Sequence, residues 1–343
     1  MGRLNEILVT GGAGYIGSHT VVELISRGYE PIIVDDFRNS DESVLKGIQA
    51  ISQTQPKVYR VDVTNKAALE EVFKNHSFAG IIHFAADKAV GESVELPLKY
   101  YSNNLIGLIN CLQLAQSYEV DNFVFSSSCT VYGEPKGIKV VDEESPIQEA
   151  NSPYGATKQM CERILTDVHA SSDSIKILSL RYFNPIGAHS SSHIGELPLG
   201  TPNNLVPYIT QTAAGVLEEL TVFGNDYNTE DGTCIRDYIH VMDLADAHIK
   251  GFEFLEKTSD AQLEVVNIGT GYGASVLEII HTFEEVSGNN LKWKFGPKRS
   301  GDVESIYADV SKAEKLLGWT ATRNIKDAIN DAWNWEKRLR SAK

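Results

Sequence analysis

Short apolar, β-branched runs alternate with amphipathic segments along the first 180 residues, and this alternation constrains the fold more than any other feature. Helical periodicity separates the runs. Strands that alternate with helices form parallel sheets covered by helices on both faces. The pattern predicts an α/β fold with a doubly wound parallel sheet. Strands are expected at residues 7–10, 31–34, 58–61, 81–84, 123–126 and 177–180, and helices at 16–27, 67–74, 98–117 and 154–168.

Beyond residue 180 the pattern changes, because proline and glycine become frequent and the later segments are shorter and mixed. The sequence predicts two domains, one at residues 1–180 and a smaller mixed α/β domain at residues 181–343, whose segments can interleave. In the second domain, strands are expected at 220–223, 238–241, 265–268 and 291–295, and helices at 244–255, 276–286 and 325–339.

Composition and charge argue against several classes of protein. A formal net charge of −15 argues against a nucleic-acid-binding protein, which needs a basic face. The four cysteines are widely spaced and contain no CxxC pair, so a reducing compartment is expected. No signal peptide is evident at the N-terminus, and no apolar run reaches the roughly 20 residues of a membrane span. A cytoplasmic protein without membrane contact is therefore expected.

The first expected strand leads directly into Thr10-Gly11-Gly12-Ala13-Gly14-Tyr15-Ile16-Gly17, which opens the first expected helix. Glycines at 11, 14 and 17 allow a tight turn, close approach of a pyrophosphate and close helix–strand packing. The N–H groups of the helix N-terminus attract phosphate. A purely structural turn is the alternative, but the strand–helix junction favours a dinucleotide site. Residues 1–180 are therefore predicted to form a Rossmann domain.

Carboxylates follow the second and third expected strands. Asp35 and Asp36 come about twenty residues after the glycine loop, where a carboxylate binds the adenosine ribose and repels a 2′-phosphate. NAD is therefore favoured over NADP, although one of the two aspartates is more simply a turn residue. Asp62 and Val63 are expected near the adenine. Phe84, Ala85, Ala86 and Lys88 follow the fourth strand, at the sheet edge that meets the ligand.

A Tyr-x-x-x-Lys pair provides candidate catalytic groups. Tyr154 and Lys158 are four residues apart, so a helix places both on one face. An ammonium group near the phenol lowers the tyrosine pKa, so Tyr154 is the predicted general base and Lys158 its electrostatic partner. Ser128 follows the fifth strand and is predicted to share the substrate proton. Ser126 and Ser127 are more simply loop caps.

The motifs GGAGYIG, SSSCTVYG, SPYGATK and TEDGTCIRDYIHVMDLADAH together resemble the extended short-chain dehydrogenase/reductase family over essentially the whole chain. The resemblance implies that Ser128, Tyr154 and Lys158 are catalytic. It implies NAD contacts at Gly11, Gly12, Gly14, Tyr15, Ile16, Gly17, Asp35, Asp36, Asn39, Ser40, Asp62, Val63, Phe84, Ala85, Ala86, Lys88, Asn103, Tyr154, Lys158 and Phe183. It implies nucleotide-sugar contacts at Lys88, Ser128, Tyr154, Asn184, Asn204, Leu205, Phe223, Arg236, Arg299 and Asp302. The two arginines can bind a diphosphate in an otherwise acidic protein.

The resemblance also implies an activity: an NAD-dependent 4-epimerase of galactose metabolism that interconverts UDP-galactose and UDP-glucose, working as a homodimer. The family's 4,6-dehydratases are disfavoured, because they carry an Asp-Glu pair where this chain has Cys129 and Thr130. The family's uronic-acid epimerases and decarboxylases match less of the C-terminal half. A non-catalytic dinucleotide sensor would not need Tyr154 and Lys158 together.

Substrate breadth depends on a position seven residues after Arg299, where many family members carry a tyrosine that limits room beside the sugar C2 substituent. Ile306 stands there, which would admit N-acetylated sugars; a one-residue shift of the alignment would restore a tyrosine, Tyr307. No metal is expected, because His189 and His193 flank a serine run without other ligand motifs.

Overall fold

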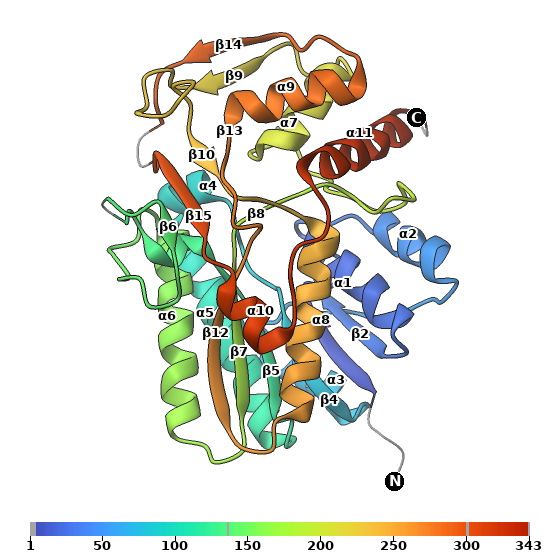
Figure 1. Ribbon diagram of the computed structural model, residues 1–343. Helices are drawn as coiled ribbons and strands as arrows, with labels where there is room; N and C mark the ends of the chain where they lie inside the picture. Colours follow the sequence, from blue (N-terminus) through green and yellow to red (C-terminus); the bar gives the residue numbers. More distant parts are fainter. Residues whose placement is uncertain (1–4, 136, 300–301, 342–343) are drawn as a thin grey trace.

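A seven-stranded parallel sheet forms the base of the molecule (Figure 1). The computed structural model describes residues 5–135, 137–299 and 302–341. The strand order is β12-β7-β5-β4-β1-β2-β3. The strands are β1 (Glu6–Thr10), β2 (Glu30–Asp35), β3 (Lys57–Arg60), β4 (Phe78–His83), β5 (Asn122–Ser128), β7 (Lys176–Tyr182) and β12 (Gln262–Ile268). The doubly wound parallel sheet predicted from the alternation is confirmed.

Helices cover both faces of this sheet, and alternate residues of each strand face the two layers. In β1, Ile7 and Val9 pack with α1 and α8, whereas Leu8 packs with α3, α5 and α6. Because both faces are buried, the strands are built mainly from apolar residues. The helices are α1 (Tyr15–Ser26), α2 (Ser43–Ser52), α3 (Lys66–Lys74), α4 (Val90–Glu95), α5 (Pro97–Ser117), α6 (Pro153–Ala170), α8 (Val241–Lys257) and α10 (Ser311–Leu317).

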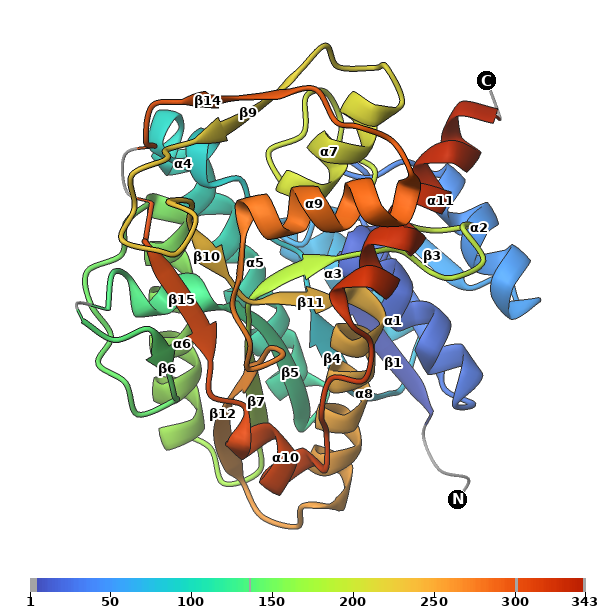
Figure 2. The same cartoon turned by 45° about the horizontal axis from the view of Figure 1, so that its top comes forward.

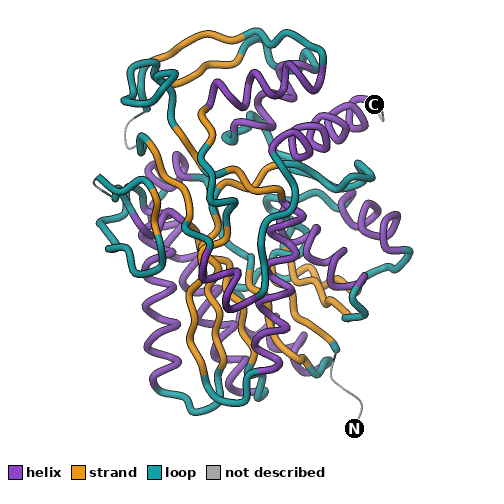
Figure 3. Tube along the Cα trace, viewed as in Figure 1, coloured by secondary structure: helices purple, strands orange, loops and turns teal. Residues whose placement is uncertain are grey.

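A second layer of short strands and helices lies above the carboxyl edge of the sheet (Figures 2 and 3). It has its own apolar core, in which Ile209, Ile280, Phe283 and Ile329 are buried. Its helices are α7 (Leu205–Ala213), α9 (Val276–Ser287) and α11 (Ile325–Ser341). Its parallel pairs are β8 (Asn184–Ile186) with β11 (Tyr238–His240), and β9 (Leu220–Phe223) with β14 (Trp293–Gly296). A four-stranded sheet joins β13 (Ala274–Ser275), β10 (Ile235–Arg236), β15 (Ser305–Ala308) and β6 (Val140–Val141).

The chain crosses between the two layers more than once. Strand β12 and helix α8 come from the second half of the sequence, yet β12 pairs along its whole length with β7 and α8 packs against α1. The expected strand at 238–241 ends at His240, because α8 begins at Val241. Within the described residues, no helix combines the length and apolarity needed to cross a membrane.

Candidate functional site

The glycine loop after β1 is a tight turn that only glycine can form at two positions. Gly11 has a φ of +69°, and a Cβ there would lie 2.7 Å from the backbone nitrogen of Ala85. A Cβ on Gly17 would lie 2.2 Å from the carbonyl oxygen of Gly11. Helix α1 starts after Gly14 without a side-chain cap, so its first N–H groups are left available for an anion. The loop thus fits the pyrophosphate of a dinucleotide.

Both aspartates at the end of β2 have defined partners. The Asp35 carboxylate accepts hydrogen bonds from the backbone N–H of Ala13 (3.0 Å) and Phe37 (2.9 Å) and from the Ser40 hydroxyl (3.0 Å). Burial raises the Asp35 pKa, and these hydrogen bonds oppose the rise. Asp35 therefore joins the glycine loop to the loop after β2, where a ribose would bind.

Arg38 is a residue of this site that the sequence did not indicate. Its guanidinium forms ion pairs with Asp36 and Asp62 and donates to the side-chain oxygen of Asn103 at 3.0 Å. Three predicted cofactor residues are thereby gathered by one side chain. The sequence does not show this contact of Arg38, because its three partners lie on separate segments that come together only at the strand ends of the folded sheet.

The other predicted cofactor residues lie on the same loops. Gly12, Tyr15 and Ile16 belong to the β1–α1 junction, Asn39 and Ser40 follow β2, and Val63 follows β3. Phe84, Ala85, Ala86 and Lys88 follow β4, and the Phe84 ring centroid lies 4.6 Å from that of His248. Phe183 is buried between β7 and β8. The carboxyl ends of the strands thus bring these segments to one edge, but their contacts with a ligand remain predictions.

Ser128, Tyr154 and Lys158 meet at the same edge. Ser128 ends β5, and Pro153 and the Ser152 cap start α6 so that Tyr154 and Lys158 share one face of its first turns. All three are at most 7% exposed. The Lys158 Nζ donates to the carbonyl oxygen of Ser126 at 2.7 Å and lies 6.0 Å from the Tyr154 ring centroid.

Burial sets the electrostatics of this pair. It lowers the pKa of Lys158 to about 8, while the negative charge of Glu162, one turn further along α6, acts to raise it. Burial also raises the pKa of Tyr154, and a hydrogen bond with Ser128 opposes that rise. A lysine that titrates near neutral pH next to a buried phenol is an arrangement suited to proton transfer.

The expectation that Ser126 and Ser127 cap loops is wrong. The Ser126 hydroxyl is 2.6 Å from that of Tyr182, and the Ser127 hydroxyl donates to Glu162 at 2.6 Å. Ser128 is the serine that caps, because its hydroxyl accepts from the backbone N–H of Thr130 at 3.2 Å. Serines inside a buried strand have no free backbone groups of a turn nearby. Their hydroxyls therefore bond to side chains of the neighbouring elements, here Tyr182 on β7 and Glu162 on α6.

A buried ion pair and its hydrogen bonds join the elements that carry Ser128, Tyr154 and Lys158. The Arg181 guanidinium donates from Nε and Nη2 to the two oxygens of Glu162, at 3.0 and 2.7 Å, and the side chains of Glu162 and Arg181 are 10% and 5% exposed. Arg181 also donates to the Tyr132 hydroxyl at 3.2 Å, and Tyr132 donates to the side-chain oxygen of Asn267 at 2.6 Å. With the Ser127 bond to Glu162, this network joins β5, α6, β7 and β12, and Ser127 directly precedes Ser128.

Apart from Lys88, Ser128 and Tyr154, the predicted nucleotide-sugar residues lie in the upper layer. The Arg236 guanidinium is 3.5 Å from the Asp302 carboxylate, and the Arg299 guanidinium lies 4.0 Å above the Phe223 ring. Asn204 precedes α7 and Leu205 begins it, whereas Asn184 begins β8. The Asn204 amide donates to Glu196 at 2.6 Å. These positions belong to segments above the carboxyl edge of the sheet (Figure 1), and their contacts with a substrate remain predictions.

The remaining candidates, Cys129 and Ile306, lie in one apolar cluster. Cys129 is half-buried against an apolar cluster that contains Ile306 and Phe183, and burial raises its thiol pKa to about 12. Ile306 is 6% exposed in β15, on the strand face opposite that of Tyr307, whose ring borders Gly273. Among the described residues no three potential ligands gather as a metal site.

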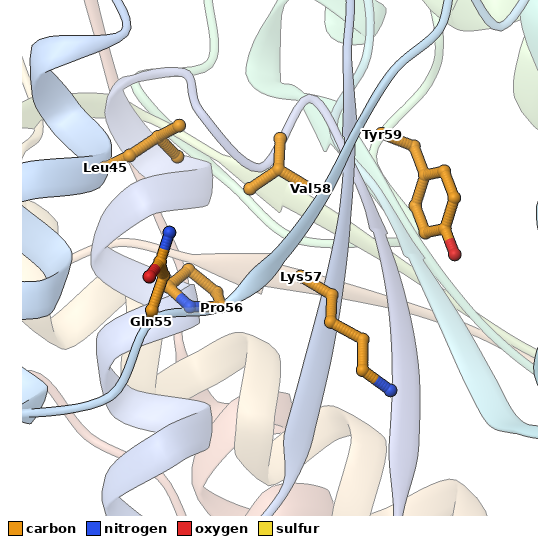
Figure 4. A pocket seen from close by; sticks show the side chains of 6 residues that line it. All are labelled: Leu45, Gln55, Pro56, Lys57, Val58 and Tyr59. Carbon is orange, nitrogen blue, oxygen red and sulfur yellow. The ribbon is translucent and has the colours of Figure 1, made fainter.

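A surface hollow of about 590 Å³ lies elsewhere, at the outer strand β3 (Figure 4). Its walls are largely apolar, and none of the predicted site residues lines it. The lining residues are Leu45, Gln55, Pro56, Lys57, Val58 and Tyr59.

A glycine loop at a strand–helix junction, with a buried Tyr-Lys pair and a serine at the same sheet edge, defines a dinucleotide-dependent enzyme of the extended short-chain dehydrogenase/reductase class. A family model described as GDP-mannose 4,6 dehydratase matches residues 8–332. The chain is 49% identical over 335 residues to UDP-glucose 4-epimerase 2 of Arabidopsis thaliana, covering 96% of this chain and 94% of the relative. It is 48% identical to UDP-glucose 4-epimerase of Bacillus subtilis (strain 168), covering 96% of each. The chain belongs to the UDP-glucose 4-epimerase family.

Solved structures agree in fold. UDP-glucose 4-epimerase from Stenotrophomonas maltophila, with bound NAD and formylated UDP-arabinopyranose, has a TM-score of 0.95 at 44% identity and covers 99% of this chain and 100% of its own. The enzyme from Bifidobacterium longum, in complex with NAD+ and UDP, has a TM-score of 0.94 at 43% identity, with 98% and 100% coverage.

Proposed function

We propose that the chain interconverts UDP-galactose and UDP-glucose, with Tyr154 as the base at the sugar 4-hydroxyl. The observation that carries this proposal is the buried group of Ser128, Tyr154 and Lys158 beside the glycine loop. The family relatives named UDP-glucose 4-epimerase support the substrate and the reaction.

The residues of this chain fit a retained NAD. The glycine loop and the uncapped start of α1 would hold its pyrophosphate, and Asp35 its adenosine ribose. NAD, when bound, would supply reversible hydride transfer at C4 of the sugar. A carboxylate at Asp35 disfavours the 2′-phosphate of NADP.

Side chains of the protein transfer the proton and bind the diphosphate. Tyr154 takes the 4-hydroxyl proton and returns it, Ser128 holds the hydroxyl, and the Lys158 ammonium stabilises the phenolate. Arg236 and Arg299 bind the diphosphate, which stays fixed while the hexose turns over. The pocket must therefore accommodate two orientations of the sugar.

The family model carries the name of a dehydratase, but dehydration requires further acid and base groups beside C5 and C6. Cys129 and Thr130 occupy the positions of the dehydratase carboxyl pair. A buried thiol whose pKa is raised to about 12 is a poor proton donor at neutral pH. Epimerisation is therefore the better supported reaction.

The test uses purified protein and UDP-galactose with no added NAD. We expect UDP-glucose to form, detected by NMR, because the cofactor is retained through each cycle. Tyr154→Phe should lower turnover by about 10²–10⁴-fold, the usual contribution of a positioned general base. Absence of product, with and without added NAD, would reject the named substrate; near-normal turnover by the variant would reject the base.

We further propose a homodimer that joins α5 and α6 to the same helices of a second copy. Leu98, Ile106, Ile109 and Met160 on these neighbouring helices are 78%, 43%, 36% and 44% exposed, which leaves apolar area for a partner. Light scattering should give a dimer mass, and lysine at positions 106 and 109 should give a monomer mass. The four free thiols favour the reducing cytoplasm as its location.

A further inference from the structure

Glu196 lies where the two layers of the molecule meet. It belongs to the loop between β8 and α7, and its side chain is only 12% exposed. Its carboxylate accepts from the Asn204 amide at 2.6 Å and lies 3.5 Å from the Lys88 ammonium. Lys88 comes from the loop after β4 and Asn204 from the upper layer. One acceptor therefore contacts two predicted ligand residues from opposite sides of the site.

The backbone of this loop is fixed, so the carboxylate has a defined position. The indole N–H of Trp335 in α11 donates to the carbonyl oxygen of Glu196 at 2.9 Å. The ring packs so closely on Gly195 that a Cβ there would lie 2.5 Å from it. At the other end of the loop, the Tyr15 hydroxyl donates to the carbonyl oxygen of Gly187 at 2.7 Å.

The chemistry of the partners indicates what this acceptor does. A carboxylate only accepts, so it fixes which end of the Asn204 amide is the nitrogen. The second N–H of that amide then has a set direction and stays available for a ligand oxygen. Lys88 retains further N–H groups in the same way, because an ammonium has three donors.

We propose that Glu196 is a positioning residue that orients the Asn204 amide toward an oxygen of the UDP portion of the UDP-hexose. This inference rests on the proposed function for the identity of the ligand. The Lys88 contact contributes less, because that side chain is 50% exposed and the ion pair is long, and such pairs contribute little. The hydrogen bond to Asn204, rather than the charge, is therefore the main effect.

Substitutions separate the two contributions. Glu196→Ala removes the acceptor, and we expect KM for UDP-galactose and Kd for UDP to rise about tenfold, the effect of losing one hydrogen bond to a charged group. Turnover at saturation should change less than about twofold, because the group acts on binding. Glu196→Gln keeps an acceptor oxygen, so it should restore Kd to within about threefold of the unaltered protein.

Two further variants test whether a change in KM comes only from a disturbed structure. Glu336→Gln is the matched control, because Glu336 is buried on α11, lines with Glu196 a small cavity between the β8–α7 loop, α7 and α11, and its carboxylate bonds only Arg340 within the described residues. It should leave KM unchanged. Trp335→Phe keeps an aromatic side chain but removes the pyrrole edge of the indole with its N–H donor, and should raise KM by about threefold through the freed loop.

A double-mutant cycle completes the experiment. If Glu196 acts through Asn204, the Glu196→Ala, Asn204→Ala double variant should bind UDP no more weakly than Asn204→Ala alone. Additive losses, unchanged or tighter UDP binding by Glu196→Ala, or a fall in turnover without a change in KM would each overturn the proposal. Calorimetry with UDP needs no turnover, so failure of the unaltered chain to convert UDP-galactose rejects the proposed function separately.

Discussion

Replacing Glu162 by glutamine should destabilise the protein far more than the loss of an ordinary surface ion pair. The carboxylate accepts two bonds from Arg181 and one from Ser127, and both charged side chains are at most 10% exposed. Glutamine keeps one acceptor oxygen but places an N–H₂ group against the guanidinium nitrogen. In the unaltered protein this nitrogen lies 2.7 Å from a carboxylate oxygen of Glu162.

The size of the effect follows from the uncompensated charge. Breaking a buried pair by removing one partner costs about 3–5 kcal/mol, because the other charge stays buried. Glutamine keeps one acceptor oxygen, so we expect this variant to lose about 3 kcal/mol of unfolding free energy, the lower end of that range. Turnover should fall as well, because Ser127 precedes Ser128 and loses its charged partner.

Urea unfolding followed by circular dichroism measures the change as a shift in midpoint at constant slope. Asp167→Asn on the same helix is the control. Its partner Arg163 is exposed, so removing this ion pair should leave the midpoint unchanged. A loss below about 1 kcal/mol for Glu162→Gln at unchanged slope would refute the reasoning, since it would equal the value of an exposed pair.

Three other predictions concern activity and specificity. The ammonium form of Lys158 exists below its pKa of about 8, so kcat/KM should fall as the pH rises past that value; a rate still rising there would contradict the role. Gly17→Ala brings a Cβ to 2.2 Å from the Gly11 carbonyl oxygen, so the purified variant should carry little NAD, whereas Gly91→Ala, in open space, should retain it. The unaltered chain should also convert UDP-N-acetylgalactosamine, and Ile306→Tyr should lose that activity while keeping UDP-galactose turnover. Equal use of both sugars by that variant would show that position 306 does not limit the pocket.

The sequence predicted the sheet because buried parallel strands require apolar runs that are visible without the structure. The glycine loop and the Tyr154–Lys158 pair were equally visible, since each is a local pattern. Short elements such as α4 and β10 were missed, because six and two residues are too few to show a period.

The supporting residues could not be predicted for a different reason. Arg38, Glu162 and Glu196 each act through partners on other elements, and for Arg38 the partners lie on three segments. A lone arginine or glutamate in a sequence is most often a surface charge. Only the packing of elements that lie far apart in the sequence identifies these three as parts of the site.

The pairing of β12 with β7 has a consequence for how the protein is made. The nascent chain completes β7 at Tyr182, but the strand that covers its outer edge ends at Ile268. At ordinary rates of synthesis, roughly 90 residues take about 5–20 s, during which a seven-residue strand that is largely buried in the folded protein has an unpaired edge. A fragment cut near residue 180 would keep that edge permanently, so we expect it to aggregate rather than fold as a cofactor-binding unit.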